Sequence, residues 1–166
     1  MLARLLRQNS GAAAAEMALV APLLITLMFG SMELGYYFYS EHVVVKAVRD
    51  GARFAARQGF SDFTCPGATI GGSVVGDTQR VTRTNQVAVG GTPRLAGWTS
   101  DASVSVTITC FDNSGGTYSS FYEGVNEFPV VTVSATVPYS SLFKLIGFNA
   151  VGLQLKASEQ AVVMGI

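Results

Sequence analysis

Hydrophobic and polar positions divide this chain into two parts. From Gly11 to about Gln58 the sequence runs without a glycine-proline turn, and the stretch from Met17 to Met32 is nearly free of charge. Roughly twenty apolar residues cross the hydrocarbon layer of a membrane, so this part predicts one long helix that starts in a membrane and continues outside it. After Gly59 the composition shifts to Gly, Thr, Ser and Val, and apolar and polar residues alternate as they do in strands.

Three segments of the second part have the period-two pattern of a strand. They are Ser103–Phe111, Val131–Val137, which stops at Pro138, and a third run from Val151 to Ser158. Each has one apolar face and one polar face. Three antiparallel strands of this kind suit a small sheet packed against the outer half of the helix, Val44–Ala56. The predicted fold class is therefore α+β.

The remaining segments are less regular. Phe60–Gly76 predicts a loop with turns at Cys65-Pro66-Gly67 and Gly71-Gly72. Asp77–Ala88 fits either a short helix capped by Asp77 or an edge strand over Arg80–Val89, and we favour the helix. A short helix or turn is expected over Tyr139–Phe148, which would present Leu142, Phe143, Leu145 and Ile146.

The outer half of the helix has two distinct faces. Val44, Val48, Ala52 and Ala55 recur at steps of three and four and form an apolar stripe, which we expect to pack on the chain's own sheet and to share that face with a subunit contact. The small residues Gly51, Ala52, Ala55 and Ala56 would let another element approach closely. Asp50 is expected to pair with Lys46 and Arg53 along its own helix. An aromatic belt at the outer membrane surface is expected from Tyr36, Tyr37 and Tyr39.

Composition and charge narrow the function classes. The 166 residues are 49% hydrophobic and 13% charged with zero formal net charge, so no bulk field attracts nucleic acid. The single histidine, His42, would have to serve any catalytic triad or histidine-based metal site, and it stands beside the membrane exit, far from most carboxylates. We therefore predict a protein that is not an enzyme, with no cofactor, no metal and no small-molecule substrate.

The two cysteines, Cys65 and Cys110, both follow the apolar run. They lack the spacing of a C-x-x-C motif, which makes zinc or redox chemistry a poor fit. A disulfide and two buried free thiols both remain open until the compartment is known. The small predicted core is a reason to expect the bond, since a cross-link would stabilise it.

The extreme N-terminus has a charge pattern of its own. Arg4 and Arg7 precede the apolar run without any acid, which indicates a cytoplasmic end under the positive-inside rule. Glu16 then lies at membrane depth, where an ionisable side chain costs about 2.5–3.5 kcal/mol and usually has a partner and a function. A cleaved secretory signal would avoid such a residue, and a plain signal anchor leaves it unexplained.

A basic leader, a glycine, four small residues and a glutamate before an apolar helix resemble a type IV prepilin. The resemblance implies cleavage after Gly11 by a membrane-embedded prepilin peptidase, which would make Ala12 the first residue and Glu16 the fifth. Glu16 would then lie one turn inside the new helix N-terminus, where the helix dipole favours a negative charge. In an assembled filament, a neighbour's free amine could pair with Glu16 and set the register between subunits.

The segment where the predicted helix leaves the membrane indicates which prepilin-like family the chain resembles. Glu33-Leu-Gly and Arg49-Asp-Gly-Ala-Arg-Phe-Ala-Ala-Arg57 resemble the TadE-like pseudopilins of the tight-adherence (Tad) pilus, with Met17 and Leu34 in place of aromatic residues. We refer to Arg49, Asp50, Gly51, Ala52 and Arg53 as the family box. The resemblance covers the first third of the chain and implies a pilin-like fold. It also implies a minor inner-membrane subunit that supports pilus assembly, with the assembly platform and other pilin-like subunits as partners.

These expectations divide the chain into four parts. They are a leader over 1–11, a membrane-spanning helix over 12–39, a helical extension over 40–58 and an extracytoplasmic domain over 59–166. The N-terminus would face the cytoplasm in a single-pass topology. The alternative function is an uncleaved, signal-anchored extracytoplasmic binding module that never assembles.

Overall fold

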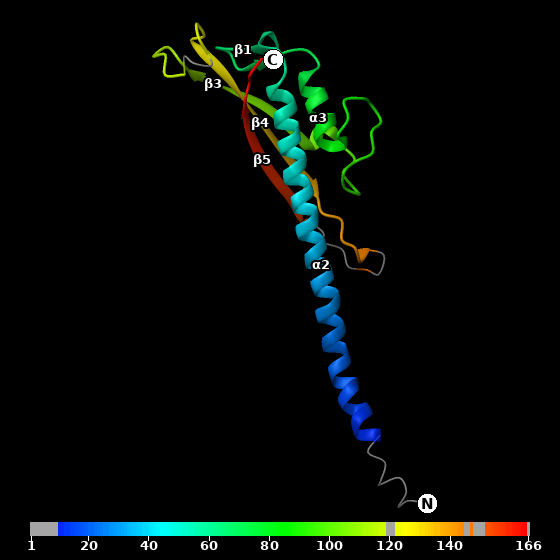
Figure 1. Ribbon diagram of the computed structural model, residues 1–166. Coiled ribbons are helices and arrows are strands. Elements are labelled where there is room, and N and C mark those ends of the chain that lie inside the picture. The colour runs from blue at the N-terminus through cyan, green and yellow to red at the C-terminus, as the bar shows by residue number, and fades with distance from the viewer. Residues whose placement is uncertain (1–9, 119–121, 145–146, 148–151, 166) are drawn as a thin grey trace, which may run out of the picture.

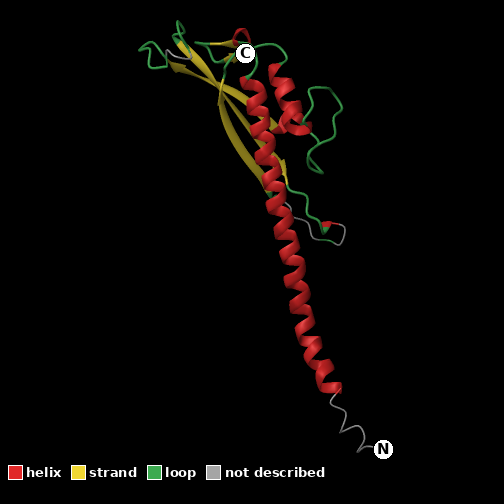
Figure 2. Cartoon of the chain, viewed as in Figure 1, coloured by secondary structure: helices red, strands yellow, loops and turns green. Residues whose placement is uncertain are grey.

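The computed structural model describes residues 10–118, 122–144, 147 and 152–165. Helix α2, Ser10–Ala56, is the longest element and has 47 residues, or about 70 Å at about 1.5 Å per residue. Figure 2 shows the N-terminal part of α2 extending away from a domain that is gathered around the second half of the helix. The predicted long helix is confirmed. Several predicted positions lie outside the described residues: leader residues 1–9, Leu145, Ile146, Phe148 and Val151.

The predicted three-stranded antiparallel sheet is confirmed, with the order β3-β4-β5. Its strands are β3 (Val104–Asp112), β4 (Glu127–Pro138) and β5 (Gln154–Val162). Strand β4 begins before the predicted Val131, because Phe128, Pro129 and Val130 are all buried and hide the period-two pattern there. Strand β5 continues past the predicted end at Ser158, as far as Val162.

Helix α3, Val74–Thr84, confirms the helical alternative for the segment after Gly76. Asp77 does not cap it, since Ser73 occupies the N-cap position and Asp77 lies in the first turn. A hydrogen bond with the Ser73 side chain and the nearby Arg80 guanidinium hold the pKa of Asp77 below its ordinary value.

The predicted loop over residues 60–76 is wrong in part. It contains a 3-10 turn (Phe60–Asp62), a small hairpin of β1 (Phe63–Thr64) and β2 (Thr69–Ile70), and the start of α3. Strands of two residues are too short to show an alternating pattern. A second 3-10 turn, Asp101–Ser103, precedes β3.

The domain has two layers. The outer half of α2 packs on β4 and β5, and α3 lies beside α2 and packs on β3 (Figure 1). The predicted apolar stripe of α2 is buried in this core, which confirms that it packs on the chain's own sheet. The C-terminal segment returns to the end of α2, where the Met164 N–H donates to the Ala56 carbonyl at 2.9 Å. Buried core residues of the sheet include Val104, Ile108, Val131, Val133, Ala135, Val137 and Leu155.

Candidate functional site

The start of α2 brings the predicted processing residues together on exposed backbone. Gly11, Ala12 and Glu16 are all exposed, and a Cβ atom added at Gly11 would meet nothing within 4 Å. Ala12 and Glu16 are four residues apart and so lie on one face of the helix. Among the described residues, Glu16 has no ion-pair partner. This carboxylate is therefore available to a group from another molecule.

The next turns of α2 present apolar side chains on every side. Among the described residues, α2 is the one helix that is long and apolar enough to cross a membrane. Its most apolar stretch is not buried against any other part of the domain. The Thr26 and Ser31 hydroxyls donate to the carbonyls of Pro22 and Met28, at 2.8 and 2.9 Å. Their polar groups are thus satisfied within the helix, as a lipid environment requires.

The three tyrosines of the predicted aromatic belt differ in exposure. Tyr139, buried at the end of β4, packs its ring against Tyr37 at 5.3 Å and against Tyr36 at 6.1 Å. Those two tyrosines therefore lie partly buried against the domain, and Tyr39 alone of the three predicted residues stays exposed. Burial, followed by the hydrogen bond to Glu33, raises the pKa of Tyr139 above its ordinary value.

Asp50 of the family box does not pair along its own helix as predicted. The Arg94 guanidinium binds Asp50 at 2.8 Å through one nitrogen and Asn85, the residue after α3, at 2.8 Å through another. Lys46 and Arg53 instead face solvent. A planar guanidinium can hold two acceptors at once, so Arg94 ties α2 to the end of α3.

Two other box residues, Gly51 and Ala52, serve the same packing. Gly51 lies where α3 comes closest, because a Cβ there would be 2.0 Å from the Thr82 Oγ1 atom. Ala52 is fully buried, which fits the expectation that small residues admit a neighbouring element. Arg49 forms a surface ion pair with Glu159 at 3.8 Å, a contact of small energetic value.

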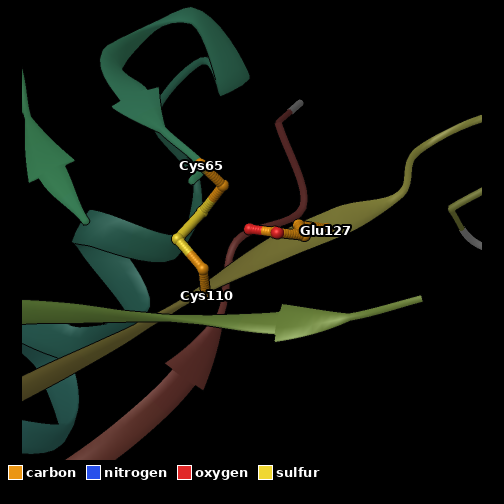
Figure 3. Close-up of side chains that lie close together, drawn as sticks. All are labelled: Cys65, Cys110 and Glu127. Carbon is orange, nitrogen blue, oxygen red and sulfur yellow. A yellow bond between two sulfur atoms is a disulfide. The ribbon is translucent and has the colours of Figure 1, made fainter. Parts of the chain in front are cut away.

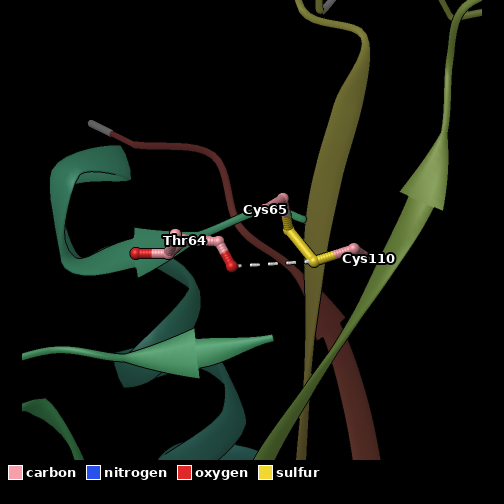
Figure 4. The surroundings of a disulfide bond; sticks show 3 residues. All are labelled: Thr64, Cys65 and Cys110. Carbon is pink, nitrogen blue, oxygen red and sulfur yellow. Dashed lines mark hydrogen bonds between the residues drawn. A yellow bond between two sulfur atoms is a disulfide. The ribbon is translucent and has the colours of Figure 1, made fainter. Parts of the chain in front are cut away.

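Cys65 and Cys110 form a disulfide, which settles the alternatives left open by the sequence. The bond joins the β1–β2 hairpin to β3, with the two Cα atoms 5.8 Å apart (Figure 4). The Cys110 sulfur also lies 3.8 Å from the Thr64 carbonyl oxygen. A disulfide sulfur carries no proton, so that approach is a van der Waals contact.

The disulfide also determines whether a nearby group of three side chains, Cys65, Cys110 and Glu127, can bind a metal ion. The Glu127 carboxylate and the two sulfurs lie within 4.8 Å of one another (Figure 3). Metal ions bind the cysteine thiolate, which neither bonded sulfur provides. With the disulfide formed, one carboxylate remains, and this group is not a metal site.

The N-terminal segment of the chain is similar to a known protein family. Residues 11–53 match the model of the TadE-like protein family, which is 43 of the 166 residues. This segment is TadE-like. No curated protein and no solved structure matches the chain. The TadE-like segment begins at Gly11 and ends at Arg53, so it contains the exposed Glu16, the apolar helix and the whole family box.

The face of the sheet that points away from α2 was predicted to be polar. At the end of the domain farthest from the N-terminus, that face is apolar instead. A pocket of about 580 Å³ lies there among side chains of the β3–β4 hairpin and β5. Tyr122 and Phe128 stack at 4.7 Å on its wall. Sequence reasoning missed it because its residues come from separate segments: Phe111, Tyr118, Tyr122, Phe128, Val130, Val162 and Met164.

Sequence reasoning also missed the partners of the TadE-like segment. Arg94, Thr82 and Tyr139 contact Asp50, Gly51 and Glu33 from positions distant in the chain. No local spacing encodes such pairs. The one usable signal was the set of small residues at the family box. It predicted that another element comes close to α2, but it could not predict which element.

Proposed function

We propose that this chain is a minor, pilin-like subunit that supports assembly of a tight-adherence pilus. The observation that carries the proposal is the TadE-like segment itself. It folds as one continuous helix from the exposed Gly11 to Gly51 and Ala52 of the family box, which are buried in the domain. Such a subunit is structural and performs no catalysis. Its partners are the membrane, the pilus assembly platform and other pilin-like subunits.

A prepilin peptidase cleaves the chain after Gly11 in this proposal. The exposed glycine supports this step, because a residue without a side chain leaves the backbone open to a protease. Cleavage removes Arg4 and Arg7 and gives Ala12 a free amine. The apolar helix then anchors the subunit in the inner membrane, with the domain on the extracytoplasmic side, where an oxidising compartment favours the Cys65–Cys110 bond.

Glu16 sets the register between subunits. A bare carboxylate in lipid is costly, and within the described residues nothing in the chain neutralises it. A neighbour's Ala12 ammonium is the group of opposite charge that subunit packing would bring to this depth. Pairing would offset the cost of burying the Glu16 carboxylate when subunits assemble in register. Subunits out of register could not form the pair, and the cost would remain.

The Glu16→Ala variant tests this function. In cells that depend on the variant, we expect normal membrane levels of the protein, loss of surface pili seen by electron microscopy, and loss of co-purifying pilin-like subunits. Glu41→Ala, which removes a carboxylate from the same helix outside the predicted membrane span, is the matched control and should assemble normally. Intact pili with Glu16→Ala would refute the registry role.

The second function, an uncleaved anchored binding module, is favoured by the apolar pocket at the end of the domain farthest from the N-terminus. A binding module has no need of the Glu16 carboxylate or of cleavage after Gly11. A chain that keeps its full length, and whose function the Glu16→Ala substitution does not change, would therefore favour this second function.

A further inference from the structure

The segment that follows β4 folds back along the apolar half of α2. From Tyr139 to Lys144 it descends beside residues 29–33 of the helix, away from the rest of the domain (Figure 1). The Phe143 ring meets the Phe29 ring edge to face, with centroids 5.0 Å apart. We refer to residues 139–144 as the descending loop.

Polar contacts fix the descending loop at this height. The Tyr139 hydroxyl donates to the Glu33 carboxylate at 2.9 Å, and the Leu142 N–H donates to its other oxygen at 3.2 Å. Glu33 belongs to the apolar half of α2, where an ionisable side chain needs such partners. The loop therefore supplies donors that make the Glu33 carboxylate tolerable near lipid.

Helix geometry places the Phe29–Phe143 contact at membrane depth. A hydrocarbon layer of about 30 Å holds about twenty helical residues at about 1.5 Å each. Counted from Ala12 the layer ends near Ser31, and counted from Met17 it ends near Tyr36. Phe29 lies inside both spans, so the Phe143 ring that touches it lies inside the layer or at its outer boundary.

The side chains of the loop suit that position. Leu142 is 46% exposed although it is large and apolar, and its N–H contacts Glu33, whose neighbours in α2, Met32 and Leu34, are exposed too. Lys144 is exposed at the end of the loop, where a long side chain can keep its charge among lipid headgroups. Continuity with the unburied apolar helix identifies lipid as the material that covers Leu142.

We propose that the descending loop inserts Leu142 and Phe143 into the outer leaflet of the phospholipid bilayer beside α2. This gives the protein a second, shallow membrane contact that fixes how far the domain stands from the surface. The inference rests on the proposed membrane anchor, and its test is arranged so that the two can fail separately.

The test uses tryptophan fluorescence of the full chain in phosphatidylcholine vesicles, with and without phosphatidylcholine brominated along its acyl chains. The native Trp98 is 1% exposed in the domain core, so the unsubstituted protein supplies the background emission. Leu142→Trp is the reporter, and Phe143→Trp is a second reporter that replaces one aromatic ring with another. Leu24→Trp, in the middle of the apolar helix, reports on the anchor, and Tyr118→Trp, on the far side of the domain, is the solvent control.

Bromines quench only indoles that reach the hydrocarbon. We expect brominated lipid to remove about half or more of the emission added by Leu142→Trp, as for Leu24→Trp, because both positions lie within the span of the layer. Tyr118→Trp should lose none. Quenching of Leu24→Trp without quenching of either loop reporter would overturn the inserted loop and leave the anchor standing. Absence of quenching at Leu24→Trp would overturn the anchor and the loop together.

Discussion

Removal of the Cys65–Cys110 bond is expected to lower the free energy of unfolding of the domain by about 2–4 kcal/mol. The bond closes a loop with a sequence separation of 45 residues, and opening it lets the unfolded chain reach many more conformations. It also releases the β1–β2 hairpin, which has two strands of two residues each and places Phe63 in the domain core. The paired variant Cys65→Ser with Cys110→Ser makes this change without leaving a free thiol.

Urea unfolding in detergent micelles, followed through the buried Trp98, measures the effect. The unsubstituted protein should unfold at lower urea when a reductant is added. The paired serine variant should already unfold at that lower concentration and should not respond to the reductant. Equal unfolding midpoints for the two proteins without reductant would mean that the bond does not stabilise the domain.

Gly51→Ala is expected to destabilise the domain by about 1–3 kcal/mol, the usual cost of forcing an extra methyl group into a packed core. A glycine-to-alanine substitution inside a helix normally raises the free energy of unfolding, because alanine is favoured over glycine there by about 0.5–1 kcal/mol. At Gly51 we expect the opposite. The reason is the Thr82 Oγ1 atom, 2.0 Å from the position of the new Cβ. Thr82 is fully buried, and its hydroxyl donates to the Thr78 carbonyl at 2.7 Å, so it has little room to move.

A double-mutant cycle isolates this contact. Thr82→Ala removes the hydroxyl, so Gly51→Ala should cost measurably less in that background than in the unsubstituted protein. Gly35→Ala is the matched control, because nothing lies within 4 Å of a Cβ at that glycine of the same helix. Urea midpoints of the four proteins of the cycle and the control give the comparison. If Gly51→Ala were as harmless as Gly35→Ala, the close approach of α2 and α3 would be refuted.

The predictable part of this fold is the part encoded by local periodicity. The uncharged run from Met17 to Met32 predicted the long helix, and the alternation around Val131 predicted β4, because burial on one side repeats along the chain. Where burial is two-sided, as at Phe128-Pro129-Val130, the alternation vanished and the strand start was misplaced. The two-residue strands β1 and β2 are too short for any period.

Contacts of the candidate site depended on the fold as a whole. The family box predicted a close approach at Gly51, yet Asp50 was assigned to Lys46 and Arg53 because helix neighbours were the only partners that the sequence offered. The observed partner, Arg94, reaches Asp50 through the segment after α3. In the same way Tyr36 and Tyr37 were expected at the membrane surface, and the ring of Tyr139 partly buries them, a contact that the sequence did not predict.

We propose above all that the TadE-like segment is processed as a prepilin and anchors a pilus subunit. Intact mass and N-terminal sequencing of the protein purified from the membrane fraction test it most directly. If a prepilin peptidase cleaves after Gly11, the purified chain begins at Ala12 and residues 1–11 are absent. A chain that begins at Met1 would contradict the processing and favour the anchored binding module, and a chain that begins after about Ser31 would contradict the membrane anchor itself.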